Sequence, residues 1–331
     1  MIGTLRGTRA GGHGISSRLP SRPRSGLAAL VVIAALATAM ASACSSAPKR
    51  PSEVVAIKNE AADYSRLADG FLAAGQYASA LQYYGEALTS NLSVDNVEGS
   101  IIARSSLGRV YLALRQYNDA ERELGDALED ARAFGRPWLI ALCLSNLGEL
   151  RYAGSDKDSA DSLFAEAETL AVGNEAVVAL VAHNRGVVAM SRGDYAAAEA
   201  FLARSAALNE RARRLSELAS DRYVLASVAH AKGDLAGAIT WAGKALAADK
   251  AAENAPGIGA DLEALGQLQR KAGHDEAAFD LYRRAFGVWL SLNREADGER
   301  CLATLSELAV KLGKESYALR YAALLEKIRQ R

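Results

Sequence analysis

The sequence has 331 residues, of which half are hydrophobic, and its 39 basic and 39 acidic side chains balance. This balance argues against a nucleic-acid-binding protein, because such proteins concentrate lysine and arginine on one face or stripe. One ordinary hydrophobic core does not organise a chain of this length, so the sequence requires either two or three domains or a repeated architecture.

The first 43 residues follow the order of a bacterial export signal. Residues 1–25 contain five arginines and no acid, and residues 26–43 form an uncharged run of apolar and small residues. The run ends in Ala41-Ser42-Ala43-Cys44, which resembles a lipobox, the site where a cysteine is lipidated and becomes the new N-terminus. Alanine stands at position 41, where that family most often has leucine. We therefore expect residues 1–43 to be a lipoprotein signal peptide and Cys44 to be the lipidation site.

Two other interpretations of this segment stay open. An uncleaved transmembrane anchor needs about 20 apolar residues, which is close to the length of the run. An ordinary signal peptide cut after Ala43 also explains the small residues. All three interpretations place the rest of the chain outside the cytoplasm. A serine after the cysteine, here Ser45, resembles the pattern of lipoproteins that are sorted to the outer membrane. In a Gram-negative cell we therefore expect the protein on the periplasmic side of that membrane.

The segment after the signal separates it from the remainder of the chain. Residues 44–54 are expected to form the lipidated N-terminus and a short proline-containing tether. Residues 1–44 hold five of the 39 basic residues and none of the 39 acidic ones, so the remainder is acidic by five charges. No nucleic-acid partner is expected.

Residues 55–331 repeat a helical hairpin about every 40 residues. The clearest copy is residues 107–127, LGRVYLALRQYNDAERELGDA, where apolar residues at spacings of three and four indicate two helices. Glycine suits the left-handed residue that ends a helix, so a periodic glycine predicts a turn in each copy. Close-packing alanines recur at Ala80, Ala120, Ala160, Ala198, Ala238, Ala278 and Ala318, and turn glycines at Gly75, Gly193, Gly233, Gly273 and Gly313, with Arg115 and Ser155 between them. Seven copies at a fixed period predict an all-α solenoid.

The residue pattern within the copies resembles that of the tetratricopeptide repeat family, notably at Gly193-Asp194-Tyr195 before Ala198 and at Ser145-Asn146-Leu147-Gly148. The usual unit of that family has about 34 residues. A 40-residue spacing is similar to the longer repeats of the kinesin light chain type. The resemblance implies a right-handed solenoid of about seven helix-turn-helix units over residues 55–331, with a concave surface that binds proteins or peptides.

Some residues interrupt the regular pattern. Pro137 and Pro256 are expected between units, because proline breaks a helix interior. Arg185 occupies the leucine position of the fourth unit, where an apolar side chain should pack. We expect this unit to be locally irregular, with Arg185 either paired to an acid or turned into the groove.

The chain shows no spacing typical of a catalytic, metal or cofactor site. Cys143 and Cys301 occupy equivalent positions four units apart, too far for a disulfide, and are predicted to be small buried hydrophobes. His183, His230 and His274 belong to no metal-binding spacing. We therefore expect no enzyme activity, no metal, no cofactor and no small-molecule substrate.

The first helix of each unit is expected to line the groove with polar side chains of both charge signs. Asn146 and Asn184 match the asparagines that hold a bound peptide's backbone in the longer repeats that this chain resembles. The predicted partner-binding residues are Asp69, Arg109, Asn146, Glu149, Tyr152, His183, Asn184, Tyr223, Ser227, His230, Glu263, Gln267 and Arg270.

The function favoured by these patterns is a membrane-anchored scaffold or adaptor that binds a protein or peptide in the cell envelope, where it helps to assemble an envelope complex. Two alternatives remain. A cell-wall-active hydrolase would need a catalytic group around His183, His230, Glu149 or Glu263. A self-associating structural solenoid would need no peptide ligand.

Overall fold

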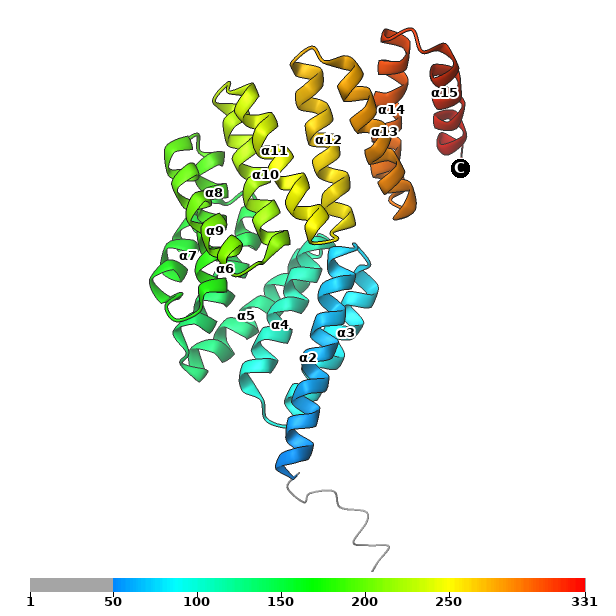
Figure 1. Ribbon diagram of the computed structural model, residues 1–331. Helices are drawn as coiled ribbons and strands as arrows, with labels where there is room; N and C mark the ends of the chain where they lie inside the picture. The colour runs from blue at the N-terminus through cyan, green and yellow to red at the C-terminus, as the bar shows by residue number, and fades with distance from the viewer. Residues whose placement is uncertain (1–49, 331) are drawn as a thin grey trace, which may run out of the picture. The chain divides into compact units, whose positions relative to one another are not determined.

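The computed structural model describes residues 50–330, and this part of the chain consists of fourteen α-helices without a strand (Figure 1). The predicted signal peptide and Cys44 lie outside the described residues. The helices are α2 (Pro51–Ala73), α3 (Tyr77–Ser93), α4 (Val97–Ala113), α5 (Tyr117–Phe134), α6 (Pro137–Ala153), α7 (Lys157–Leu170), α8 (Glu175–Ser191), α9 (Tyr195–Arg211), α10 (Leu215–Ala231), α11 (Leu235–Ala251), α12 (Ala255–Lys271), α13 (Asp275–Ser291), α14 (Glu295–Lys311) and α15 (Glu315–Arg329).

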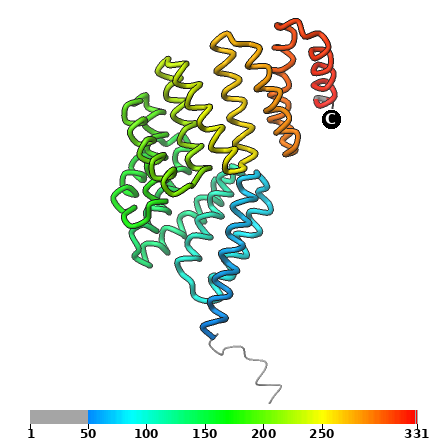
Figure 2. The backbone as a smooth tube through the Cα atoms, in the orientation of Figure 1, coloured from blue at the N-terminus to red at the C-terminus, as the bar shows by residue number. Residues whose placement is uncertain are grey.

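Successive helices pair into seven hairpins, from α2–α3 to α14–α15, and each hairpin packs on the next (Figure 2). Even-numbered helices also contact one another along the array, as α4 contacts α6 and α6 contacts α8. The even-numbered helices are therefore the inner layer of the solenoid and the odd-numbered helices the outer layer. This confirms the predicted all-α repeat architecture. No helix between residues 50 and 330 has the length and apolar character needed to cross a membrane.

The turns between helices share one backbone conformation. Each contains a residue with positive φ, which closes the preceding helix in the left-handed conformation. Glycine fills this position at Gly75, where φ is +72°. Arg115 (φ +59°) and Ser155 (φ +68°) adopt the same conformation where the periodic glycine is missing. The 40-residue period therefore specifies the turn geometry even where the residue type has changed.

Small residues in the inner layer allow the two helices of a hairpin to approach closely. A Cβ atom added at Gly148 of α6 would lie 2.5 Å from the Cε1 atom of Phe164 in α7. A Cβ atom at Gly108 would lie equally close, at 2.5 Å, to the Cγ atom of Leu124. In both hairpins the large side chain occupies the space that the glycine leaves, so glycine and large residue act as a complementary pair.

The two prolines of the repeat domain lie at helix starts instead of between units, which corrects the sequence prediction. Pro137 is the first residue of α6 and Pro256 lies in the first turn of α12. Proline is compatible with these positions because the first N–H groups of a helix have no intrahelical acceptor. Similarly, α2 begins at Pro51, inside the segment expected to be a tether.

Arg185 is paired to an acidic side chain, which is one of the two arrangements expected from the sequence. Its guanidinium forms an ion pair with Glu168 of α7 and lies over the ring of Phe201, 4.5 Å from the ring centroid. Arg204 shares the same carboxylate, with 2.7 Å between its Nη1 atom and Glu168 Oε1. The charge is thus accommodated between the fourth hairpin and its neighbours.

Two seams between hairpins contain buried carboxyl groups. At the α9–α10 seam, Asn209 Nδ2 donates to Asp221 Oδ2 at 2.8 Å. At the equivalent positions of the α11–α12 seam, Asp249 faces Asp261, and both are at most 5% exposed. Burial raises the pKa of both carboxyls, and the neighbouring Asp249 helps to raise the pKa of Asp261 to about 8. At neutral pH we therefore expect this pair to hold a proton.

The glycine–phenylalanine contact leads to a stability prediction. Gly148→Ala forces a methyl group against Phe164, so it should lower the free energy of unfolding by about 1–3 kcal/mol. The matched control is Gly125→Ala in α5, where a Cβ atom would meet nothing within 4 Å. This control should raise stability by about 0.5–1 kcal/mol, because alanine favours helix more than glycine does. Thermal denaturation followed by circular dichroism measures both, and equal effects would contradict the packing argument.

The buried carboxyl pair predicts a pH dependence of stability. Asp261 releases its proton near pH 8 when folded and near pH 3.8 when unfolded, so stability should fall as pH rises between these values. Asp249→Asn reproduces the arrangement of Asn209 and Asp221. This substitution should remove most of the fall in stability with rising pH, and it should raise the free energy of unfolding at pH 8 by about 1–3 kcal/mol.

Melting temperatures at pH 5 and pH 8 measure the effect of Asp249→Asn. The control is Asp280→Asn, which changes an exposed carboxylate of α13 whose side chain is 66% accessible. The control should keep the slope of the wild type. If Asp249→Asn also keeps that slope, the pair does not hold a proton at neutral pH.

Candidate protein-binding groove

The inner layer of helices contains two hollows, which we name by their place along the chain. The N-terminal hollow, with a volume of about 540 Å³, is lined by residues of α4, α6, α8, α9 and α10. The C-terminal hollow consists of two cavities. The larger one, of about 870 Å³, lies between α10, α12 and α14 with α13 at its base, and the smaller one, of about 230 Å³, lies between α10 and α12. The two cavities share Tyr223, Gln267 and Lys271. These hollows give an extended ligand room along the inner layer.

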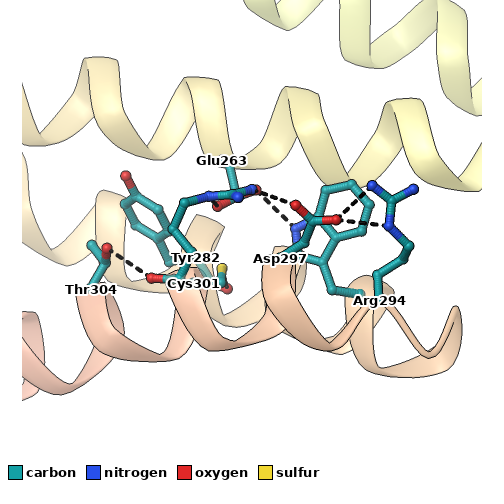
Figure 3. A network of polar contacts seen from close by, with 8 residues as sticks. Glu263, Tyr282, Arg294, Asp297, Cys301 and Thr304 are labelled. Atoms are coloured by element: carbon teal, nitrogen blue, oxygen red, sulfur yellow. Dashed lines mark hydrogen bonds and ion pairs between the residues drawn. The ribbon is translucent and has the colours of Figure 1, made fainter. Parts of the chain in front are cut away.

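A network of charged groups forms one wall of the C-terminal hollow (Figure 3). Glu263 of α12 accepts from the Nη2 atom of Arg300 at 2.9 Å and from the indole N–H of Trp289, also at 2.9 Å. Asp297 pairs with Arg300 at 2.9 Å and with Arg294, whose Nε atom lies 2.8 Å from Asp297 Oδ2. Hydrogen bonds to Glu263 and Asp297 raise the pKa of Arg300 further above its ordinary value. The network links α12, α13 and α14 along this wall.

Arg294 also connects this wall to the first hairpin. Its guanidinium lies 5.6 Å from the centroid of the Trp289 ring. A Cβ atom at Gly75 in the α2–α3 turn would lie 3.0 Å from the Nη1 atom of Arg294. The coil of the solenoid thus brings a turn of the first hairpin to the edge of the C-terminal hollow.

The remaining side chains of the C-terminal hollow offer mixed chemistry. Tyr223 is 40% exposed, and partial burial raises its pKa. Lys271 Nζ lies 2.7 Å from His230 Nε2, and Arg270 forms an ion pair with Glu307 at 3.1 Å. An aromatic surface beside both donors and acceptors is typical of a site for a polar peptide.

The N-terminal hollow has a buried polar base. His183 Nδ1 lies 2.8 Å from Asp221 Oδ1, and this carboxylate has no exposed surface. Arg109 and Glu149 line the same hollow, and Trp138 contributes an apolar wall. Arg109 forms no ion pair within residues 50–330, so its guanidinium is available to an acceptor from outside the chain.

The two asparagines singled out from the sequence lie differently from the expectation. Asn146 and Asn184 are only 2% and 7% exposed. Asn146 Nδ2 donates to Ser105 Oγ at 2.7 Å, and Asn184 Nδ2 donates to Ser145 Oγ at 3.0 Å and to Glu149 Oε1 at 2.9 Å. Both amides join successive inner helices instead of projecting as free groups, because each reaches back to a serine of the preceding hairpin.

Two further predicted residues lie away from the hollows. Asp69 accepts a hydrogen bond from the hydroxyl of Tyr84 within the first hairpin. Tyr152 is partly buried against a cluster formed by Ala160, Phe164 and Val188. Asn146 is likewise absent from the lining. The predicted residues that do line a hollow are Arg109, Glu149, His183, Asn184, Tyr223, Ser227, His230, Glu263, Gln267 and Arg270.

Sequence reasoning missed much of the charged wall. Arg300 and Thr304 stand one 40-residue period after Ala260 and Ala264, which line the same cavity, so the period itself could have located them. Trp289 carried no such signal. It belongs to an odd-numbered helix and reaches the cavity only between two inner helices.

The groups available for catalysis are incomplete in the described part of the chain. The pair of His183 and Asp221 resembles the base and orienting acid of a catalytic triad, but no hydroxyl or thiol is hydrogen-bonded to the imidazole there. Cys143 and Cys301 are unpaired and buried, and burial raises the pKa of each thiol to about 12. No group of three metal-binding side chains occurs between residues 50 and 330. The arrangement can bind polar groups, and it offers no activated nucleophile.

The hairpin array and its inner groove define the class of protein as an α-helical repeat solenoid. Residues 101–136 match the tetratricopeptide repeat family model. The match covers most of the α4–α5 hairpin, which is therefore similar to a tetratricopeptide repeat. No curated protein sequence matches the chain.

Solved structures share the fold at low sequence identity. A Rap protein in complex with competence and sporulation factor aligns with a TM-score of 0.58 at 16% identity, over 82% of this chain and 75% of that one. Aspartyl phosphate phosphatase F from Bacillus subtilis aligns with a TM-score of 0.54 at 17% identity, over 80% and 69%. PilF of Pseudomonas aeruginosa aligns with a TM-score of 0.50 at 18% identity, over 71% and 92%. These likenesses show a common solenoid fold.

Proposed function

We propose that this protein is a non-catalytic scaffold that binds an extended segment of a partner protein in its inner groove. The observation that carries this proposal is the pair of hollows along one layer of helices, lined by aromatic and charged side chains without an activated nucleophile. The Rap structure supports it, since that protein has the same fold and was solved in complex with competence and sporulation factor. The likeness to a phosphatase is one of fold alone.

The proposal includes a place in the cell. Ala41-Ser42-Ala43-Cys44 favours lipidation of Cys44, and residues 45–50 then leave the repeat domain close to the membrane. A scaffold held there is suited to assembling an envelope complex, whose members lie in or beside the same membrane. In a Gram-negative cell we infer the periplasmic face of the outer membrane.

The lipid anchor is tested by Cys44→Ala. Wild type should incorporate labelled palmitate and sediment with membranes, whereas the variant should incorporate none and be released, because the thiol that carries the lipid is missing. Ser42→Ala is the matched control and should behave as wild type. Wild type that sediments with membranes but incorporates no label would instead support an uncleaved transmembrane anchor.

The groove is tested by crosslinking in membranes followed by affinity capture of the full chain. Tyr223→Ala/Gln267→Ala removes two exposed side chains shared by both cavities of the C-terminal hollow. Capture of the envelope protein bound by wild type should fall at least tenfold, the loss expected when an interface loses about 1.4 kcal/mol.

A control variant for this capture is Thr240→Ala/Arg283→Ala, which alters exposed side chains of the outer helices α11 and α13. It should capture the partner as wild type does. Equal capture by the groove variant would overturn the proposal, and sedimentation at two protein concentrations would then test self-association. Asn146→Ala/Asn184→Ala is a poorer probe, because both amides hold inner helices together.

A further inference from the structure

Asp221 of α10 is a buried carboxylate at a seam position that Asp261 occupies in α12 and that is apolar at two other seams. The equivalent residues at two other seams are Val181 and Cys143, both fully buried. Asp221 Oδ2 accepts from Ser205 Oγ at 3.0 Å and from Asn209 Nδ2 at 2.8 Å. Both donors from α9 thus bind Oδ2 and leave Oδ1 for a donor from α8.

That donor is His183, whose Nδ1 atom lies 2.8 Å from Asp221 Oδ1. Because a carboxylate only accepts hydrogen bonds, Nδ1 must carry a proton. A neutral imidazole with its proton on Nδ1 has a lone pair on Nε2. The tautomer is thus set by a carboxylate whose side chain has no exposed surface.

The free edge of the imidazole belongs to the N-terminal hollow. The His183 side chain is 24% exposed and lines this hollow together with Arg109 and Asn184. No second hydrogen bond to the ring is formed within residues 50–330. The Nε2 lone pair is therefore available to a donor from outside the chain.

The charges of the hollow indicate what kind of donor fits. Besides Asp221, which is paired to His183, two carboxylates and two guanidinium groups line it and balance, so a cationic donor gains little over an uncharged one. An apolar wall beside the imidazole suits the side chain of an extended segment, whose neutral main-chain N–H then faces the ring. The charged residues are Glu149, Glu217, Asp221, Arg109 and Arg214, and the wall is Trp138, Leu142 and Leu180.

We propose that His183 Nε2 accepts a hydrogen bond from a main-chain N–H group of the bound partner, and that Asp221 is the positioning residue that keeps this lone pair in the groove. This inference rests on the proposed function and assigns a hydrogen-bonding polarity to one point of the groove. His183 would then bind the main chain of the partner, a role that the sequence had suggested for the amides of Asn146 and Asn184.

Asp221→Asn tests the inference with little change of shape. The asparagine carbonyl can still accept from Ser205 and Asn209, while its N–H group donates to His183 Nδ1. The proton of the imidazole then moves to Nε2, so the groove presents a donor where it had an acceptor. Nitrogen-15 spectra of the imidazole should show protonated Nδ1 in wild type and protonated Nε2 in the variant.

The binding probe is a twelve-residue peptide enriched from a random display library on the immobilised full chain. Each main-chain amide of this peptide is replaced in turn by an ester, which removes one N–H group. At one position the ester should weaken binding to wild type about tenfold, as expected for a lost hydrogen bond to a desolvated acceptor. Asp221→Asn should weaken binding of the parent peptide by a similar factor and bind that ester as well as it binds the parent.

His183→Phe is a second variant, which removes the acceptor and keeps a ring, and should show the same loss as Asp221→Asn. His274→Phe is the matched control, in an exposed turn outside both hollows, and should leave the ester position unchanged. Melting temperatures establish that each variant is folded.

The possible outcomes separate the inference from the proposed function. If no ester loses its effect in Asp221→Asn, or if wild-type His183 carries a proton on Nε2, the inference is overturned. If the peptide binds Arg109→Ala and Tyr223→Ala as tightly as wild type, the groove is not the binding surface and the proposed function fails as well. Binding that is sensitive to Arg109→Ala but not to Asp221→Asn overturns the inference alone.

Discussion

The close approach of the two helices in each hairpin is the constraint on which the rest of this structure depends. Gly148 leaves space for Phe164, and Gly108 leaves space for Leu124, so the inner and outer helix of a hairpin pack at short range. At Ala226 the inner residue gains a methyl group, and the outer partner there, Ala242, is small as well. The complementary sizes keep the hairpin geometry constant, and constant geometry is what allows seven hairpins to stack with one period.

Stacking at a constant period has a direct consequence for the groove. Residues 40 positions apart occupy equivalent places, so the inner surface is a row of similar sites whose chemistry differs only by substitution. Polar residues replace apolar ones at buried positions of two seams between hairpins: Asn209 and Asp221 at one seam, and Asp249 and Asp261 at another. A buried polar group must find a partner, and here the partners extend from the seam to the surface, as when Asp221 orients His183. The interior of the solenoid thus determines which atoms the groove presents.

The two hollows differ in how their side chains are held. In the C-terminal hollow, Glu263, Asp297 and Arg300 satisfy one another across helices and form one wall. In the N-terminal hollow, Arg109 has no ion pair in the described part of the chain and His183 is anchored from below. The first wall is pre-organised by mutual pairing, whereas the second hollow keeps free hydrogen-bonding capacity for a partner. An extended segment spanning both would meet an ordered surface at one end and available polar groups at the other.

The sequence by itself determined the helical hairpins, their period, their turns and the identity of the groove-facing helices. Helix periodicity and glycine positions are local properties, and repetition makes them additive, so errors in one unit are corrected by the others. Only the tertiary structure decided which groove residues are free. Asn146 and Asn184 fit the pattern of ligand-holding amides, yet a serine one hairpin earlier lies within hydrogen-bonding distance of each and binds it. The roles of Trp289 and Asp221 could not be predicted for a related reason. Contacts between hairpins depend on how long each side chain is and which residue faces it at the seam, and the repeat period contains neither piece of information.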